Sequence, residues 1–97
     1  MIYGYCRTAI EYDYSIQKQM NAIDKYCKAN NCEVEFYIDD GVSGFTLDRP
    51  EMNKLLSKAQ EGDTIVVTDI AKLTRNMADY NYIISRGIKV VFTSLGV

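Results

Sequence analysis

Short apolar runs rich in β-branched and aromatic residues alternate along this chain with segments whose apolar residues recur every three or four positions. The runs cover residues 2–6, 33–38, 64–68 and 88–92. The connections are too short for anything but right-handed crossovers that return each strand to one parallel sheet. The third run, TIVVT, has the continuous β-branched character of a central strand. The alternation therefore predicts an α/β fold in three layers, a mainly parallel four-stranded sheet with helices on both faces, flavodoxin-like in outline.

The first helix is predicted to begin with Ser15 as its capping residue and to end near Asn30, where two asparagines follow each other. Its apolar residues lie on one helical face. They are Ile16, Met20, Ile23 and Cys27. The strand after this helix alternates, so Val34, Phe36 and Ile38 are expected on one face of the sheet. Tyr3 and Tyr5 are likewise expected on one face of the first strand.

The second helix is predicted to follow a loop that holds two glycines and the only proline. Asp48 and Glu51 have the spacing of a capping box, Pro50 suits the first turn, and Gly62 is expected to end the helix. A third helix is predicted over 76–86 and stopped by Gly87. The residues expected to face the core are Met52, Leu55, Leu56 and Ala59 in the second helix and Met77, Tyr80, Ile83 and Ile84 in the third.

Composition limits the function classes. The 97 residues fit one domain, and 11 basic against 13 acidic residues give a net charge of -2. A binding site for phosphate must therefore be local, because no field over the whole surface attracts DNA or an anionic membrane. The chain has no histidine, and its three cysteines form no Cys-x-x-Cys pair, which argues against a zinc site and against histidine catalysis. We expect no metal and no cofactor, with cysteines that serve as small buried residues in a reducing compartment.

The N-terminal apolar run, residues 1–6, is too short for a signal peptide or a membrane span. The expectations are therefore a cytoplasmic location and no membrane partner.

Four cations follow the predicted strands or lie just beyond them. In an open parallel sheet, ligands bind beyond the carboxyl ends of the strands, so these cations are expected to converge there. They are Arg7, Arg49, Lys72 and Arg75. Guanidinium groups suit phosphate, because each planar fork donates two hydrogen bonds and keeps its charge. The alternative is a set of solvated surface cations paired with Asp40, Asp69 or Asp79, and the spacing alone leaves both interpretations open.

Five stretches in order resemble the catalytic domain of the serine site-specific recombinases, the resolvase/invertase family. They are YGYCRTA, YSIQKQMNAIDKYCKAN, DDGVSGFTLDRPEMNKLL, EGDTIVVTDIAKLTRN and GIKVVFTSL, which together span nearly the whole chain. The segment YSIQKQ is more similar to the large serine recombinases than to the small resolvases. The resemblance implies the fold derived above and metal-independent cleavage and rejoining of DNA through a phosphoserine link.

In that family the nucleophilic serine stands in the pattern Tyr-x-Arg-x-Ser, and here Ala9 occupies its position after Arg7. In the pattern Leu-Asp-Arg-Leu-x-Arg, Ala71 replaces the aspartate and Lys72 the first arginine. The residues retained for catalysis or for binding phosphate are Arg7, Gln19, Arg49, Lys72 and Arg75. Because alanine has no oxygen to attack with, the resemblance implies a site that has lost its chemistry.

Three other residues are candidates to substitute for the lost side chains. Thr8 follows Arg7 on an extended segment, so its side chain is expected to point to the opposite side. Ser15 is expected to cap a helix. Asp69 precedes the family's aspartate position by two residues and is the candidate to replace it, although a carboxylate at the end of a strand is more often a salt-bridge partner.

The resemblance implies one catalytic-type domain over 1–97, without the long dimerisation helix and the DNA-binding region of the family. The expected partners are DNA, a second copy of the chain or an active recombinase. The alternative is a non-enzymatic recombinase homologue that binds a protein, phosphate or DNA. Nucleotide binding in a flavodoxin-like crevice is a weaker third idea, because CRTAIEYD holds no glycine for a phosphate loop.

Overall fold

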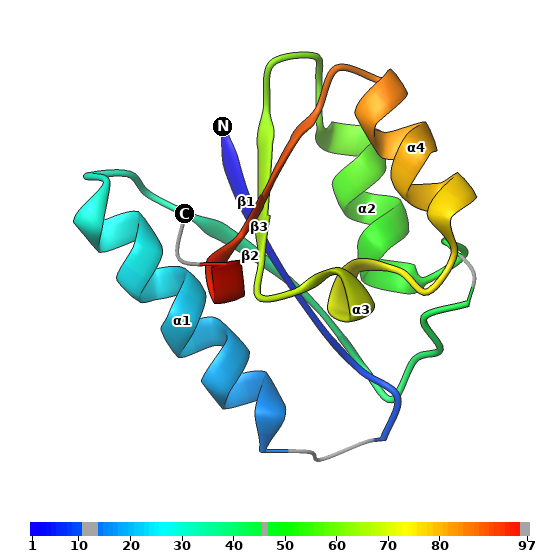
Figure 1. The fold of residues 1–97 in the computed structure, drawn as a ribbon, viewed down its shortest axis with the longest axis horizontal. Coiled ribbons are helices and arrows are strands. Elements are labelled where there is room, and N and C mark those ends of the chain that lie inside the picture. Colours follow the sequence, from blue (N-terminus) through cyan, green and yellow to red (C-terminus); the bar gives the residue numbers. More distant parts are fainter. Residues whose placement is uncertain (11–13, 46, 96–97) are drawn as a thin grey trace.

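The computed structural model describes residues 1–10, 14–45 and 47–95. Strands and helices alternate along the chain as expected (Figure 1). The strands are β1 (Ile2–Thr8), β2 (Glu35–Asp40), β3 (Thr64–Val67) and β4 (Lys89–Phe92). The helices are α1 (Ser15–Ala29), α2 (Pro50–Lys58), α3 (Ile70–Leu73) and α4 (Met77–Ser85), and a 3-10 turn, η1 (Thr93–Leu95), follows β4.

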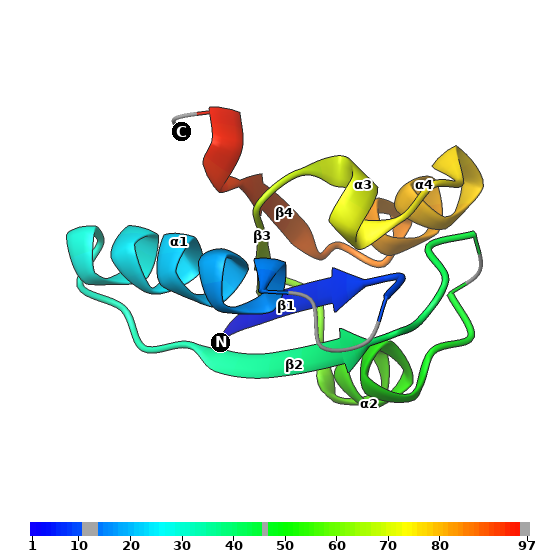
Figure 2. The same cartoon turned by 90° about the horizontal axis from the view of Figure 1, so that it is seen from below.

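The four strands form one sheet in the order β2-β1-β3-β4, and every pair is parallel. Helix α1 covers one face, while α2 and α4 cover the other (Figure 1). The predicted three-layer α/β class is confirmed, and β3 is an interior strand as expected from its sequence. In Figure 2 the arrowheads of β1 and β2 point to the same end of the sheet. The candidate site lies at this carboxyl edge.

Each face of the sheet has its own core. Tyr3, Tyr5 and Tyr37 pack with Met52 and Leu55 of α2 on one face. On the other face, Cys6 and Val66 pack with Ile23 and Cys27 of α1. Val34, Phe36 and Ile38 all lie against this second cluster, and Tyr3 and Tyr5 share the first, so the predicted faces are confirmed. The second strand, however, begins at Glu35, two residues later than predicted, so Val34 lies just before it. Cys6 and Cys27 are buried as expected, whereas Cys32 is only half-buried, and all three cysteines are free thiols.

The helix ends differ from the prediction in three places. Tyr14, not Ser15, is the residue that precedes the first turn of α1, and its side chain makes no capping hydrogen bond, so the capping role predicted for Ser15 is wrong. The predicted capping box of Asp48 and Glu51 is also wrong, since the residue before α2 is Arg49 and the acceptor comes from another element, as shown below. Pro50 is the first residue of α2 as expected, but the helix ends at Lys58 rather than at Gly62.

Helix α4 buries fewer side chains than its sequence predicted. Ile83 is buried and Tyr80 half-buried, whereas Met77 and Ile84 are exposed, against the prediction that all four face inward. The helix is only nine residues long and shares its side of the sheet with α2, so it buries a narrow stripe. Gly87 follows it with φ 78, a left-handed conformation that glycine adopts without strain, and the predicted stop is confirmed. Within the described residues, none of the helices has the length and apolar character needed to cross a bilayer.

Candidate functional site at the carboxyl edge of the sheet

The end of β1 is held in place by a glutamine from α1. The backbone N–H of Arg7 donates to Gln19 Oε1 at 3.1 Å, and Gln19 Nε2 donates to the Arg7 carbonyl oxygen at 3.0 Å. Gln19 is 3% exposed, so both bonds lie in a buried place where unpaired polar groups would be costly. Gln19, predicted to bind DNA or phosphate, thus contacts the backbone of Arg7.

The Arg7 guanidinium is buried among main-chain carbonyl groups. Its Nε donates to the Lys72 carbonyl at 3.1 Å, its Nη2 to the Ala71 carbonyl at 2.7 Å, and its Nη1 to the Val42 carbonyl at 2.7 Å. Gly44 lies against the same group, and a Cβ at that position would come within 2.7 Å of Nη2. Burial, and after it the charge of Arg49, lowers the pKa of Arg7. The surrounding carbonyl dipoles offset part of this cost.

The Arg49 guanidinium lies in the same interior, at the start of α2. Its Nη1 donates to the Leu73 carbonyl at 2.6 Å and to the Tyr5 hydroxyl at 3.0 Å, and its Nη2 donates to the Gly44 carbonyl at 3.3 Å. The side chain is fully buried. Arg7 and Arg49 therefore bind the last three carbonyls of α3: those of Ala71 and Lys72 accept from Arg7, and that of Leu73 accepts from Arg49.

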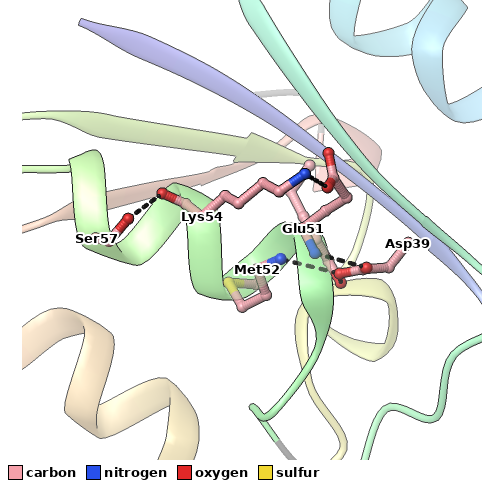
Figure 3. Close-up of polar contacts among 6 residues, drawn as sticks. Asp39, Glu51, Met52, Lys54 and Ser57 are labelled. Atoms are coloured by element: carbon pink, nitrogen blue, oxygen red, sulfur yellow. Dashed lines mark hydrogen bonds and ion pairs between the residues drawn. The ribbon is translucent and has the colours of Figure 1, made fainter.

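A buried carboxylate, that of Asp39, joins this arrangement from the end of β2. Asp39 Oδ2 accepts from the Tyr5 hydroxyl at 2.8 Å and from the Met52 backbone N–H at 3.0 Å, and Oδ1 accepts from the Glu51 N–H at 2.9 Å. Figure 3 shows the carboxylate facing the first turn of α2. An anion is favoured there because the first N–H groups of a helix have no partner within it. Asp39 therefore supplies the cap that Asp48 was predicted to give.

Sequence reasoning missed both Asp39 and Tyr5. One signal was available, since the first aspartate of DDG directly follows an apolar strand, where side chains reach the binding edge of a parallel sheet. The register places Asp39 beside Arg7. Nothing in the sequence tells that Tyr5, an inward residue of β1, carries a hydroxyl that bonds both Asp39 and Arg49.

The remaining predicted site residues lie closer to solvent. Ala9 is exposed, just beyond β1; Lys72 and Ala71 are half-buried in α3; and Arg75 is exposed. The Arg75 backbone N–H donates to the Gly44 carbonyl at 2.8 Å, which ties the segment after α3 to the loop that contacts Arg7. The alternative of solvated cations in salt bridges is wrong for Arg7 and Arg49, which are buried and donate to carbonyls.

The candidate substitutes Thr8 and Asp69 make contacts away from the Arg7 guanidinium. The Thr8 hydroxyl donates to Asp40 Oδ1 at 2.8 Å and to the Ile10 carbonyl, away from the partners of Arg7, as expected. Asp69 caps α3 by accepting from the Lys72 N–H at 3.2 Å. Within the described part of the chain, no group of three acidic or cysteine side chains is placed to hold a metal ion.

Buried positive side chains outnumber buried negative ones in this interior. Among the described residues, two guanidinium groups are buried, those of Arg7 and Arg49, against one carboxylate, that of Asp39. Two positive charges and one negative charge give this edge of the sheet a local positive potential, which favours an anion nearby. At the position that the family's nucleophile would take, Ala9 offers only a methyl group. The arrangement suits recognition of an anion and provides no attacking oxygen at residue 9.

Comparisons with known proteins agree with this geometry. A family model described as "Resolvase, N terminal domain" matches residues 2–96. A resolvase of Clostridium perfringens is 28% identical over 86 residues, covering 89% of this chain and 43% of that protein. The Transposon Tn501 resolvase of Pseudomonas aeruginosa is 29% identical over 97 residues, covering 96% of this chain and 47% of that protein. The chain thus spans less than half the length of these relatives.

Among solved structures, the N-terminal catalytic domain of TP901-1 integrase superposes with a TM-score of 0.84 at 25% identity, covering 99% of this chain and 79% of that one.

Proposed function

We propose that this chain, which belongs to the resolvase N-terminal domain family, is a serine-recombinase catalytic domain that no longer cleaves DNA. The observation that carries the proposal is Ala9, placed just beyond β1 and two residues after the buried Arg7. In the family reaction a serine oxygen at this place attacks a DNA phosphorus atom, the bond from phosphorus to the 3′ oxygen breaks, and the protein becomes linked to the 5′ end. A methyl group supplies no electron pair for that attack.

The cations of the site take the role of phosphate ligands in this proposal. Arg7 and Arg49 provide the buried positive charge, while Lys72 and Arg75 approach DNA from the surface. Gln19 positions Arg7 through its backbone, an indirect contribution to the binding of phosphate. Lys72 keeps the charge of the family's arginine and lacks its two-pronged geometry, and Ala71 lacks the family's carboxylate, so both weaken the site further.

Residues 1–97 form one catalytic-type domain in this proposal, and DNA and a second recombinase chain are its partners. The curated relatives are about twice as long as this chain. Dimerisation and the reading of a DNA site are assigned to the parts of those relatives that it does not match.

A chimera with the Tn501 resolvase tests the proposal. This chain replaces the matched segment of the resolvase, and the protein is mixed with that resolvase's own recombination site. We expect no covalent protein–DNA adduct on a denaturing gel from the chimera with Ala9. The double variant Ala9→Ser with Ala71→Asp is expected to form the adduct, because it regains the attacking oxygen and the lost carboxylate.

Two controls make the result specific. Arg7→Ala in the repaired chimera should abolish the adduct, while a gel shift shows that each chimera still binds the site. An adduct with Ala9 in place would contradict the loss of cleavage. A repaired chimera that binds the site and forms no adduct would contradict the assignment of a recombinase site.

A second candidate function is protein interaction without chemistry. It is favoured by apolar side chains beside the site, since Ile10, Phe45 and Met77 are 71%, 70% and 58% exposed. They lie within two residues of Thr8, Gly44 and Arg75, the segments that surround the arginines. Sedimentation of the chain with and without an intact resolvase distinguishes the two. Association that Phe45→Glu removes would support interaction, and a monomer in every mixture would oppose it.

A further inference from the structure

Two of the three cysteines meet at the C-terminal end of α1. Cys27 lies in the last turn of this helix, and Cys32 lies beyond it, before β2 begins at Glu35. Cys27 belongs to the core cluster between α1 and the sheet, and Cys32 packs against the same cluster. In Figure 2 this end of α1 lies near the start of β2, whereas the arrowheads of the strands point to the opposite end of the sheet. The pair is therefore separate from the arginines at the carboxyl edge.

The backbone after α1 folds back on the helix in a Schellman motif. The Cys32 N–H donates to the Cys27 carbonyl at 3.0 Å, and the Asn31 N–H donates to the Lys28 carbonyl at 3.3 Å. Asn31 has φ 54, a left-handed conformation that asparagine adopts more readily than most residues. In this motif the residue after the left-handed one commonly contacts the side chain five positions before it. Cysteines occupy both of these positions here, so the backbone itself brings the two thiols together.

The side chains of the pair are close to each other and differ in their access to solvent. Cys32 Sγ donates to the Cys27 carbonyl oxygen at 3.5 Å. Burial, and after it the interaction with the neighbouring Cys32 thiol, raises the pKa of Cys27 to about 12. Cys27 is 1% exposed, whereas Cys32 is half-buried, and both are free thiols. A reagent in solution therefore reaches Cys32 first.

We propose that Cys27 and Cys32 form a dithiol site, which low-molecular-weight disulfides such as oxidised glutathione convert to an intramolecular disulfide. The Cys32 thiolate attacks one sulfur of oxidised glutathione, and the first glutathione leaves as a thiolate. The Cys27 sulfur then attacks Cys32 in this mixed disulfide, and the second glutathione leaves. The two thiol protons of the protein pass to the released glutathione thiolates, and the two electrons that the protein loses reduce the reagent. This inference does not depend on the function proposed above.

The third cysteine provides an internal control. Cys6 is fully buried within β1, and burial raises its pKa to about 12. A buried and protonated thiol neither meets the reagent nor attacks it. Cys27 is buried as well, and it reacts only because Cys32 carries the mixed disulfide to it.

Oxidation of the native chain tests the proposal. The folded chain is incubated with oxidised glutathione at neutral pH and quenched with acid, and its remaining thiols are alkylated after unfolding. Intact-mass measurement and peptide mapping then identify the state of each cysteine. We expect the alkylating group on Cys6 alone, a bond between Cys27 and Cys32, and no attached glutathione.

Single variants separate the two steps. Cys27→Ala should stop at the mixed disulfide, so that glutathione remains attached to Cys32. Cys32→Ser should take up no glutathione, because Cys27 then has no accessible neighbour. Cys6→Ala is the matched control and should form the disulfide as the native chain does. Circular dichroism shows whether each variant keeps its helices, and the native chain decides the proposal whatever the variants do.

Three results would overturn the proposal. A native chain that is alkylated at every cysteine has no reactive dithiol, and one that stops at the mixed disulfide has thiols too far apart to close the bond. A disulfide that includes Cys6 would contradict the pairing. Glutathione attached to Cys27 in a folded Cys32→Ser variant would contradict the order of attack.

Discussion

Arg7 shows how one side chain can serve both the fold and a candidate site. Its three carbonyl partners come from α3 and from the loop after β2, so the side chain helps to hold these two segments together. Gly44 permits this arrangement, because any larger residue would collide with the guanidinium. The need for glycine here is one of space, since a Cβ would occupy the volume of Arg7.

Gly44→Ala tests this close approach. We expect the substitution to lower the free energy of unfolding by about 1–3 kcal/mol, because the new methyl group forces Arg7 away from its carbonyl partners. Urea unfolding of the four proteins of a double-mutant cycle measures it. In the Arg7→Ala background the same methyl group has room, so its cost should largely vanish. Equal costs in the two backgrounds would show that Gly44 matters for another reason.

At the scale of single elements, α2 shows the limit of local patterns. Asp48 and Glu51 match a capping box in sequence, yet the first turn takes its acceptor from Asp39, which is brought there by the end of β2. The exposed Asp48 accepts instead from the Asn53 side chain at 3.0 Å. A helix start was predictable from Pro50, because its position depends on local geometry alone. The identity of the cap depends on the tertiary structure.

Substitution of Asp39 and of Asp48 should lower the stability of the fold by very different amounts. Asp39→Ala should lower the free energy of unfolding by about 3–5 kcal/mol, because it leaves a buried hydroxyl and two helix N–H groups without their acceptor and removes a buried carboxylate close to the buried arginines. Asp48→Ala, an exposed change, should cost less than about 1 kcal/mol. Chemical denaturation of both variants at neutral pH measures the difference. A larger loss of unfolding free energy in Asp48→Ala than in Asp39→Ala would show that Asp48, not Asp39, caps α2.

The rest of the site illustrates the same limit. Apolar runs that alternate with helical segments predicted the strands. Because the connections are short, they also predicted a parallel sheet and thus the edge to which the cations are carried. Helix α3 was not predicted, since four residues carry no helical period. Its carbonyls are nevertheless the main partners of Arg7 and Arg49, and nothing in the sequence shows that two arginines far apart in the chain share them.

At the scale of the whole molecule, both cores contain acids that burial keeps neutral. Burial raises the pKa of Tyr3 and Tyr5 on one face of the sheet, and that of Cys6, to about 12, and Cys27, to about 12, on the other. In the unfolded chain the thiols and phenols ionise near about pH 8.5 and 10. Between these values and the raised pKa values, the folded protein binds more protons than the unfolded one.

Stability should therefore be full below about pH 8.5 and should decline as the pH rises through the unfolded and then the folded pKa values. We expect urea midpoints to fall steadily from about pH 8.5 to pH 11. The variant Cys6→Ala with Cys27→Ala should have a lower midpoint at pH 7 and a shallower decline above it, since two of the titrating groups are gone. A decline of the same steepness in this variant would mean that other groups cause it.

The contact between Gln19 and Arg7 has a consequence for the architecture of the sheet. The pairing of β1 with β3 covers Ile2, Tyr3 and Gly4, while its pairing with β2 continues to Thr8. At Arg7 the Gln19 carboxamide both accepts and donates, as the peptide group of a neighbouring strand would. The ladder is thus completed by a side chain from outside it. A peptide partner is lost only on substitution to proline, whereas almost any substitution of Gln19 removes this side-chain partner. The anchorage of the strand end that carries the site therefore depends on a single residue.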